Sequence, residues 1–163
     1  MSPSLTIEDD ILSPTDSLKV NFKGKNPFSV TNEYIDFLKA VMKISTKDVV
    51  ETDLRYDITE DPRGFYGMWA GSRKEDRWTR TTIRIIAQGE QSSKDSTGSI
   101  TMNIKGSITT TYNYTNFIQK SFWWFFNHMF YYANRRRYFE FAKVNIHEIR
   151  EKVLRHLQIY KEE

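Results

Sequence analysis

The sequence predicts a single α+β domain in which an antiparallel sheet is closed by a long C-terminal helical segment. At 163 residues the chain has the usual length of one domain with one hydrophobic core. Between residues 18 and 114, most apolar side chains alternate with polar ones, as in half-buried strands, whereas later ones recur at helical spacing. Because short loops join the strand-like segments, neighbouring strands must pair mostly antiparallel.

Residues 1–16 are predicted to form a flexible acidic arm outside the domain of residues 17–163. The arm contains two prolines and few apolar side chains, so it has little surface to bury. Its acidic residues are Glu8, Asp9, Asp10 and Asp16. Because the whole chain carries a net charge of +3, the remaining domain carries +7. A basic domain suits nucleic acid, anionic lipid or an acidic partner.

The first predicted strand covers residues 18–23, before Gly24, and a helix follows it. Asn26 and Pro27 have the pattern of a helix start, with Thr31 as the alternative capping residue. The apolar stripe of the helix consists of Val30, Tyr34, Phe37, Leu38, Val41 and Met42.

Four more strands are predicted at residues 50–58, 65–72, 78–88 and 100–114. The inward side chains of the first are predicted to be Val50, Thr52, Leu54, Tyr56 and Ile58. One face of the third carries Ile83, Ile85 and Ala87. One face of the fourth carries Ile100, Met102, Ile104, Ile108, Tyr112 and Tyr114. A sheet with one apolar face needs a cover, which the first helix and residues 117–160 must provide.

The C-terminal segment has two different halves. Residues 117–133 are apolar nearly all round. The second half has an ordinary amphipathic stripe made of Ala142, Ile146, Ile149, Val153, Leu157 and Tyr160. Two interpretations of residues 117–133 stay open: a core element that the sheet encloses, or a segment that contacts a membrane or a partner. The uncharged run of residues 121–134 would span about 21 Å as a helix, short of a bilayer core of about 30 Å.

The residue types present argue against most catalytic chemistry. The chain has no cysteine and three histidines, so a thiolate metal site and a cysteine nucleophile are excluded. Its seven glycines form no phosphate-binding or dinucleotide-binding motif. We therefore predict no metal and no cofactor, and an enzyme is the least favoured class, with His128 as the single candidate acid or base. The N-terminus lacks the pattern of a secretory signal, which favours a cytoplasmic location with membrane association as an extension.

Arg135, Arg136 and Arg137 are the candidate anion-binding residues. One or two of them would hold a phosphate or carboxylate. Consecutive residues of a helix point in different directions, so the three cannot share one anion. The alternative is a solvated surface or a helix-capping role.

The order strand, helix, antiparallel meander and long C-terminal helix resembles the helix-grip arrangement of the START-like superfamily, which includes lipid-transfer domains and polyketide cyclases. The resemblance implies a cavity between sheet and helix for an apolar ligand such as a lipid. The expected lining residues are Trp69, Ile85, Met102, Tyr112, Trp124 and His128.

Three functions follow, in order of preference. The first is binding of an apolar small molecule or lipid, with peripheral contact to a membrane surface. The second is nucleic-acid binding through the outward-facing side chains of Arg80, Arg84 and Lys105. The third is a homo-oligomer held together by the aromatic segment.

Overall fold

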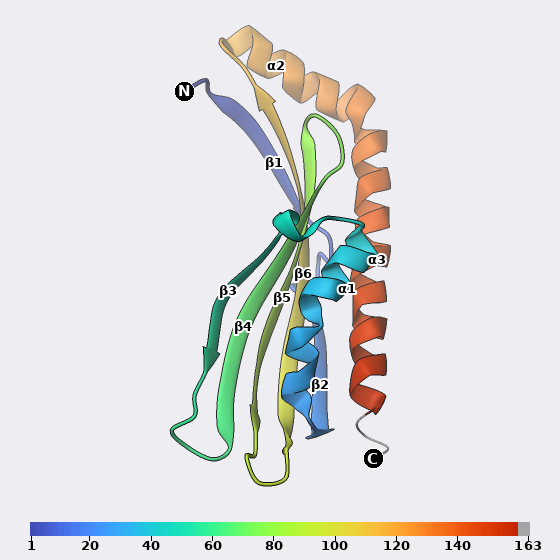
Figure 1. Cartoon of the computed structure of the whole chain (residues 1–163). Coiled ribbons are helices and arrows are strands. Elements are labelled where there is room, and N and C mark those ends of the chain that lie inside the picture. The colour runs from blue at the N-terminus through green and yellow to red at the C-terminus, as the bar shows by residue number, and fades with distance from the viewer. Residues whose placement is uncertain (160–163) are drawn as a thin grey trace.

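The computed structural model describes residues 1–159 and confirms the α+β class, with an antiparallel sheet covered on one face by helices (Figure 1). The strands are β1 (Ser4–Asp10), β2 (Leu18–Lys25), β3 (Val49–Tyr56), β4 (Arg63–Lys74), β5 (Thr79–Gln91) and β6 (Thr97–Asn113). The helices are α1 (Tyr34–Met42), α2 (Phe117–Phe126) and α3 (Tyr132–Ile159). A π-helical segment at Asn127–Tyr131 joins α2 to α3, and short 3₁₀ turns lie at Pro27–Asn32 and Thr46–Asp48.

The sheet has the strand order β1-β6-β5-β4-β3, and β2 also pairs with β6. β6 is long enough that β1 and β2 lie end to end along one of its edges, β1 beside Ser107–Asn113 and β2 beside Thr97–Ile104. Between them, the backbone N–H of Ile11 donates to the carbonyl of Gly106 at 3.0 Å. This edge of β6 is therefore paired along most of its length.

β1 lies within residues 1–16, where we expected a flexible arm. Ser4–Asp10 instead forms a strand of the sheet. Leu5 and Ile7 are half-buried and alternate with exposed neighbours, which is the pattern of a strand. The sequence suggested no strand here because the segment is acidic and has few apolar side chains. Backbone hydrogen bonds to β6 nevertheless hold it in the sheet.

The hydrophobic core lies between the inner face of the sheet and the helices α1 and α3 (Figure 1). The predicted apolar faces of β5 and β6 are confirmed, except that Tyr114 is only half-buried. The predicted stripe of α3 is also confirmed, and its fully buried members are Ala142, Ile146, Ile149, Val153 and Leu157. Tyr160 lies outside the described residues. α1 begins only at Tyr34, because the expected first turn is 3₁₀.

The predicted inward face of β3 is wrong for most of the strand, but Tyr56 at its end does lie on the inner face, opposite the buried Phe65 and with its ring centroid 4.9 Å from that of Phe28. Val50, Leu54, Tyr56 and Ile58 are between 41% and 66% exposed. In the register that forms, Val50 lies opposite Ala70 on the outer face, which is the face without helices. β3 is an edge strand, so much of its surface stays in contact with water.

Two features set this orientation of β3. Glu51 lies opposite Trp69 on the inner face, and its carboxylate accepts a hydrogen bond of 2.7 Å from the Trp69 indole N–H. Beyond Thr52 the register shifts at a bulge, where Asp53 has a φ of 55°. A bulge inserts a residue and reverses which side chains face inward, so a strict alternation read from the sequence cannot hold through it.

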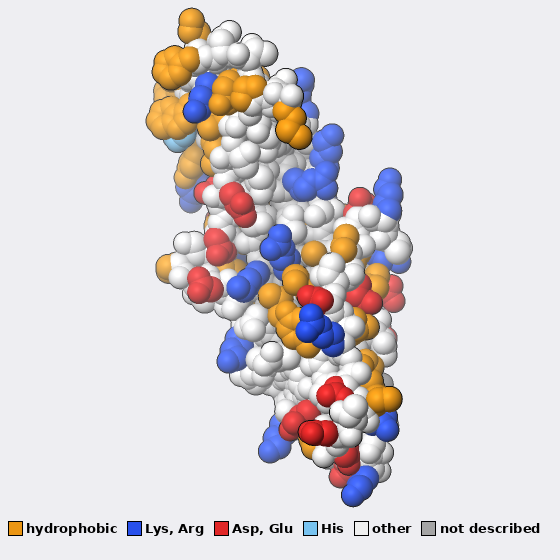
Figure 2. All heavy atoms as spheres, turned by 90° about the vertical axis from the view of Figure 1, so that its left-hand side faces the viewer, with side chains coloured by type: hydrophobic (Ala, Val, Ile, Leu, Met, Phe, Trp, Pro, Cys, Tyr) orange, Lys and Arg blue, Asp and Glu red, His pale blue; other side chains and the backbone are white. Residues whose placement is uncertain are grey.

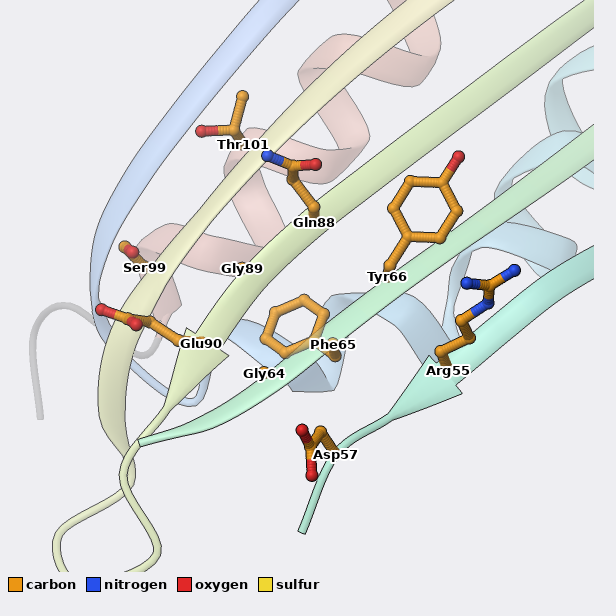
Figure 3. A pocket seen from close by; sticks show the side chains of 10 residues that line it. All are labelled: Arg55, Asp57, Gly64, Phe65, Tyr66, Gln88, Gly89, Glu90, Ser99 and Thr101. Carbon is orange, nitrogen blue, oxygen red and sulfur yellow. The ribbon is translucent and has the colours of Figure 1, made fainter. Parts of the chain in front are cut away.

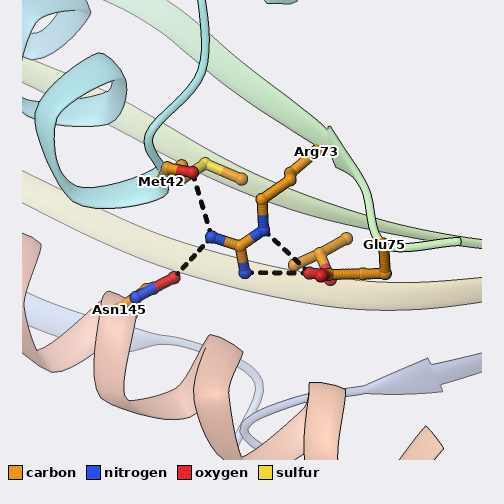
Figure 4. A network of polar contacts seen from close by, with 5 residues as sticks. Met42, Arg73, Glu75 and Asn145 are labelled. Carbon is orange, nitrogen blue, oxygen red and sulfur yellow. Dashed lines mark hydrogen bonds and ion pairs between the residues drawn. The ribbon is translucent and has the colours of Figure 1, made fainter. Parts of the chain in front are cut away.

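A polar network ties α1, α3 and the hairpin between β4 and β5 together (Figure 4). Arg73 Nη1 donates to the Met42 carbonyl at 3.0 Å and to Asn145 Oδ1 at 3.1 Å. Arg73 Nε donates to Glu75 Oε1 at 2.9 Å, and the Thr81 hydroxyl donates to the same oxygen at 2.7 Å. The Glu75 charge is therefore directed inward and neutralised.

Candidate functional site

The exposed side of α2 and of the segment up to Tyr132 is the candidate functional site, and we call it the aromatic cap. Its members are Phe117, Ile118, Phe122, Trp124, Phe125, Met129, Phe130 and Tyr132, each between 51% and 80% exposed. Within residues 117–133 only Asn127 and Tyr131 are buried. The interpretation of this segment as an enclosed core element is thus wrong. α2 crosses the end of the sheet (Figure 1), and Figure 2 shows hydrophobic side chains gathered at that end.

The other side of α2 is fixed to the sheet by stacked rings. Trp123 lies parallel to Tyr112 of β6, with ring centroids 4.8 Å apart and an angle of 8° between the planes. Trp78 meets Trp123 at 5.8 Å and Phe126 at 5.7 Å. The Trp123 indole N–H also donates to the Asn113 carbonyl at 3.0 Å. α2 is held in place from below, and the cap is what this packing leaves exposed.

The π-helical segment keeps one side of the long helix on the sheet. Trp123, Asn127, Tyr131 and Arg135 all face inward at steps of four residues. In a regular α-helix, each such step would rotate the side chain by about 40°. A wider π turn absorbs part of this drift. Asn127 then reaches Tyr112, whose hydroxyl donates to Asn127 Oδ1 at 3.1 Å.

Asp76, in the loop between β4 and β5, accepts four hydrogen bonds. The donors are the Tyr131 hydroxyl, the Tyr138 hydroxyl at 3.0 Å and the backbone N–H groups of Trp78 and Thr79 at 2.8 and 2.9 Å. Partial burial acts to raise the pKa of Asp76, but these hydrogen bonds outweigh it and hold the pKa below its usual value. Burial, together with the bond to Asp76, raises the pKa of Tyr131. At neutral pH, Asp76 therefore stays ionised and Tyr131 stays protonated, so the phenol can donate to the carboxylate.

The three candidate arginines occupy different environments. Arg135 is 8% exposed and forms an ion pair with Asp9 of β1. Arg136 and Arg137 are exposed. Arg135 and Arg136 line a surface depression of about 550 Å³ that also contains four acidic residues, namely Glu8, Asp9, Asp10 and Glu140. These carboxylates would repel an anion that enters the depression. The anion-binding role of the three arginines stays a prediction.

The six predicted ligand-binding residues do not come together. Trp69, Ile85, Met102 and Tyr112 are at most 1% exposed. Trp124 and His128 lie instead on the outside of the helical segment, where their rings stack with centroids 4.0 Å apart. The His128 Nδ1 lies 2.8 Å from the Trp124 carbonyl oxygen. Their shared role in ligand binding stays a prediction.

The outer face of the sheet carries a second depression, of about 560 Å³ (Figure 3). Tyr66, Gln88 and Thr101 lie side by side there, because the register places them opposite one another on β4, β5 and β6. Arg55 borders the row on one side, and the acidic lining residues are Asp57 and Glu90. With both signs of charge present, this surface has no clear electrostatic preference.

No helix in the described part of the chain is long and apolar enough to cross a membrane. Among the same residues, no group of three or more acidic or histidine side chains has the arrangement of a metal site.

No protein-family model matches the sequence, and no curated protein matches it. The fold and the site therefore define the class: an α+β protein whose C-terminal helical segment presents an aromatic cap at one end of an antiparallel sheet.

Sequence reasoning identified the aromatic segment but missed what holds it. The carboxylate of Asp76 was hidden in a charged hairpin loop, and nothing in the local pattern points to Tyr131 or Tyr138. The signal in the sequence is limited to polar groups at helical spacing, namely Asn127 and Tyr131 within the apolar segment and Tyr138 beyond the three arginines.

Proposed function

We propose that this protein is a lipid-binding protein that docks on a membrane surface through the aromatic cap. The observation that carries the proposal is the exposure of eight large apolar side chains on one helical segment at the end of the molecule. Monomeric proteins rarely expose contiguous apolar patches larger than a few hundred Å² unless the patch binds something. Burying such surface contributes about 25 cal/mol per Å².

The side-chain types favour the boundary between lipid and water. Trp124 and Tyr132 combine an apolar ring with a polar group, and such residues prefer the headgroup level of a bilayer. Between Asp95 and Glu140 the sequence contains no acidic residue. The cations next to the cap are Lys120, Arg136 and Arg137, all exposed. Each basic residue close to an anionic membrane contributes about 1 kcal/mol of attraction.

The arrangement of the cap favours a fluid partner over a rigid one. Phe117 and Ile118 are adjacent and both about 80% exposed, and Trp124 and Phe125 are also adjacent, both more than half exposed. Consecutive helical residues point about 100° apart, so apolar surface covers more than one side of the helix. Lipid can surround such a helix, whereas a rigid protein surface covers one side only.

The lipid contact that we propose is at the surface and not inside the domain. The interior between sheet and helices is filled by the side chains of Trp69, Ile85 and Met102, each at most 1% exposed. Admitting a lipid between β-sheet and α3, as the helix-grip resemblance implies, would require those side chains to move.

Vesicle co-sedimentation tests the proposal. The test variant is Trp124→Ser/Phe125→Ser, and the matched control is Val50→Ser/Ile58→Ser, which removes similarly exposed apolar side chains from the region of β3. We expect the test variant to lose vesicle affinity by about tenfold or more, because two large rings no longer leave water, and the control to bind like the wild type. Equal binding by all three proteins would contradict the proposal.

The competing outcome is self-association through the cap. Light scattering on the same proteins reports it without lipid. A stable oligomer that becomes monomeric in the test variant, together with no vesicle binding by the wild type, would assign the cap to a subunit interface instead.

A further inference from the structure

The hairpin between β4 and β5 presents three cations close to the aromatic cap. Lys74 and Arg80 lie directly opposite each other on neighbouring strands, and both point to the outer face of the sheet. Arg77 lies in the loop that joins them, and all three side chains are exposed. Like charges directly opposite each other across two strands destabilise a sheet, so this pair acts against the hairpin unless an anion joins it.

The carboxylates of the same loop compensate these cations only in part, because the one negative charge of Asp76 leaves a net charge of +2 from the four charged side chains that line the depression. Glu75 is occupied by Arg73 on the inner face (Figure 4). Asp76 lines the same depression as the cations, but its two oxygens already accept four hydrogen bonds. In the part of the chain that the structure describes, Lys74, Arg77 and Arg80 form no ion pair.

A second pair of like charges on the same face is different. Arg84 lies opposite Lys105, and both line a depression together with Glu8 and Asp10. The carboxylates of Glu8 and Asp10 in β1 thus lie near Arg84 and Lys105 and offset their positive charges. The three hairpin cations share their depression with one carboxylate, Asp76, whereas Arg84 and Lys105 share theirs with two.

The three cations line a depression of about 330 Å³, which also exposes the side chains of Thr109 and Thr111. Guanidinium groups bind phosphate oxygens through paired hydrogen bonds, an ammonium adds a point charge, and hydroxyls donate to the same oxygens.

Trp78 connects this depression to the cap. It lines the depression, the Arg77 guanidinium lies 5.1 Å from the centre of its ring, and the ring packs against Trp123 and Phe126 beneath α2. Phosphate binding and insertion of the cap would therefore take place at the same end of the molecule.

We propose that Lys74, Arg77 and Arg80 bind the phosphate of an anionic lipid headgroup while the cap enters the bilayer surface. The inference rests on the proposed membrane function and adds a lipid class to it: phospholipids whose headgroup carries an accessible, net negative phosphate. The cap supplies affinity for any bilayer, and the hairpin supplies the preference for anionic ones.

The test compares two variants with the same change in charge. One is Lys74→Gln/Arg77→Gln/Arg80→Gln at the hairpin. The other is Lys19→Gln/Lys23→Gln/Lys25→Gln on β2, which pairs with the opposite half of β6 from β1. Each is titrated with vesicles of phosphatidylcholine alone and with vesicles containing phosphatidic acid. We expect the hairpin variant to lose about tenfold or more of the affinity for the acidic vesicles, and the β2 variant to lose little.

Equal losses in both variants would show that only net charge matters, and no loss in either would show that the hairpin does not bind headgroups; both results overturn the inference. Neither result affects the cap, because binding to neutral vesicles is measured in the same experiment and depends on Trp124 and Phe125.

Amide chemical shifts of the wild type with glycerol 3-phosphate distinguish a lipid-bound from a free phosphate. Shifts at residues 74–80, together with the loss of preference for acidic vesicles in the hairpin variant, support the inference. Shifts without any vesicle binding would assign the site to a soluble phosphate compound, which overturns the lipid assignment and the proposed function together.

Discussion

The Tyr131 hydroxyl donates to the carboxylate of Asp76, and this contact fixes the helical segment to the hairpin between β4 and β5. The same carboxylate also accepts from Tyr138, which lies nearly two turns into α3. One acidic side chain therefore holds both the π-helical segment below the cap and the start of the helix that covers the core. Tyr131 itself is 2% exposed, so the contact is shielded from water on the phenol side.

Replacing Asp76 with asparagine is expected to lower the free energy of unfolding by about 1–3 kcal/mol, because two phenols and two backbone N–H groups lose a charged acceptor. Urea unfolding at pH 7 measures this change. Asp16→Asn, at an exposed position of the loop between β1 and β2, is the control and should have no measurable effect.

The same carboxylate predicts a pH dependence. Because the pKa of Asp76 is lowered in the folded state, its stabilising contribution is complete above the unfolded value of 3.8 and is lost as the pH falls through the folded pKa. The difference in stability between wild type and Asp76→Asn should thus shrink below about pH 4. A difference that stays constant from pH 7 to pH 2.5 would contradict this assignment.

Replacement of two adjacent tryptophans should lower the stability of the fold to very different extents. Trp123 stacks on Tyr112 and donates to a backbone carbonyl, whereas Trp124 is 56% exposed. Trp123→Ala is expected to destabilise the fold by about 2–4 kcal/mol, and Trp124→Ala by less than about 0.5 kcal/mol. Chemical unfolding of the two variants checks the contrast, and similar losses would mean that α2 packs differently.

The approach of α3 to the sheet depends on a residue without a side chain. A Cβ at Gly106 would lie 2.6 Å from Ile146 Cδ1 and 2.8 Å from Ile11 Cδ1, whereas a Cβ at Gly64 would meet nothing within 4 Å. Gly106→Val should therefore cost about 1–3 kcal/mol through overpacking. Gly64→Ala should leave the melting temperature nearly unchanged, and thermal unfolding of both variants measures the difference.

The ion pair between Arg135 and Asp9 connects α3 to β1. Arg135→Gln should destabilise the protein by about 1 kcal/mol, because the largely buried Arg135 side chain is replaced by a shorter one that loses the ion pair with Asp9, while Arg136→Gln should change stability little. Amide hydrogen exchange gives a local readout: residues 4–10 should exchange faster in the first variant only. Uniform acceleration across the sheet would argue against a specific tie to β1.

The regular elements could be predicted because their side-chain period matches their burial. The stripe of α3 follows from apolar residues at steps of three and four, and the inner faces of β5 and β6 follow from alternation. β3 could not be oriented in the same way, because the bulge near Asp53 and the hydrogen bond from Trp69 to Glu51 depend on tertiary contacts. β1 was missed because backbone pairing, and not apolar burial, places it in the sheet.

The composition of residues 117–133 alone cannot show whether this segment is enclosed by the fold or exposed at its surface. An enclosed helix and an interfacial helix are both apolar on most sides, so the sequence left both interpretations open. What decides between them is where α3 begins to cover the sheet, since α2 lies beyond that point across the sheet end (Figure 1). The cations of the hairpin were visible in the sequence, but their placement opposite each other follows only from the register of β4 and β5.

The most direct measurement of the central claim is quenching of tryptophan fluorescence by vesicles of brominated lipid. Trp69 is buried, Trp78 packs against the inward-facing Trp123 of α2, and Trp124 is the tryptophan of the cap. We predict strong quenching in the wild type and its loss in Trp124→Phe, which keeps an apolar ring and therefore still binds the vesicles. Binding without any quenching, or quenching that persists unchanged in Trp124→Phe, would show that the cap does not enter the lipid.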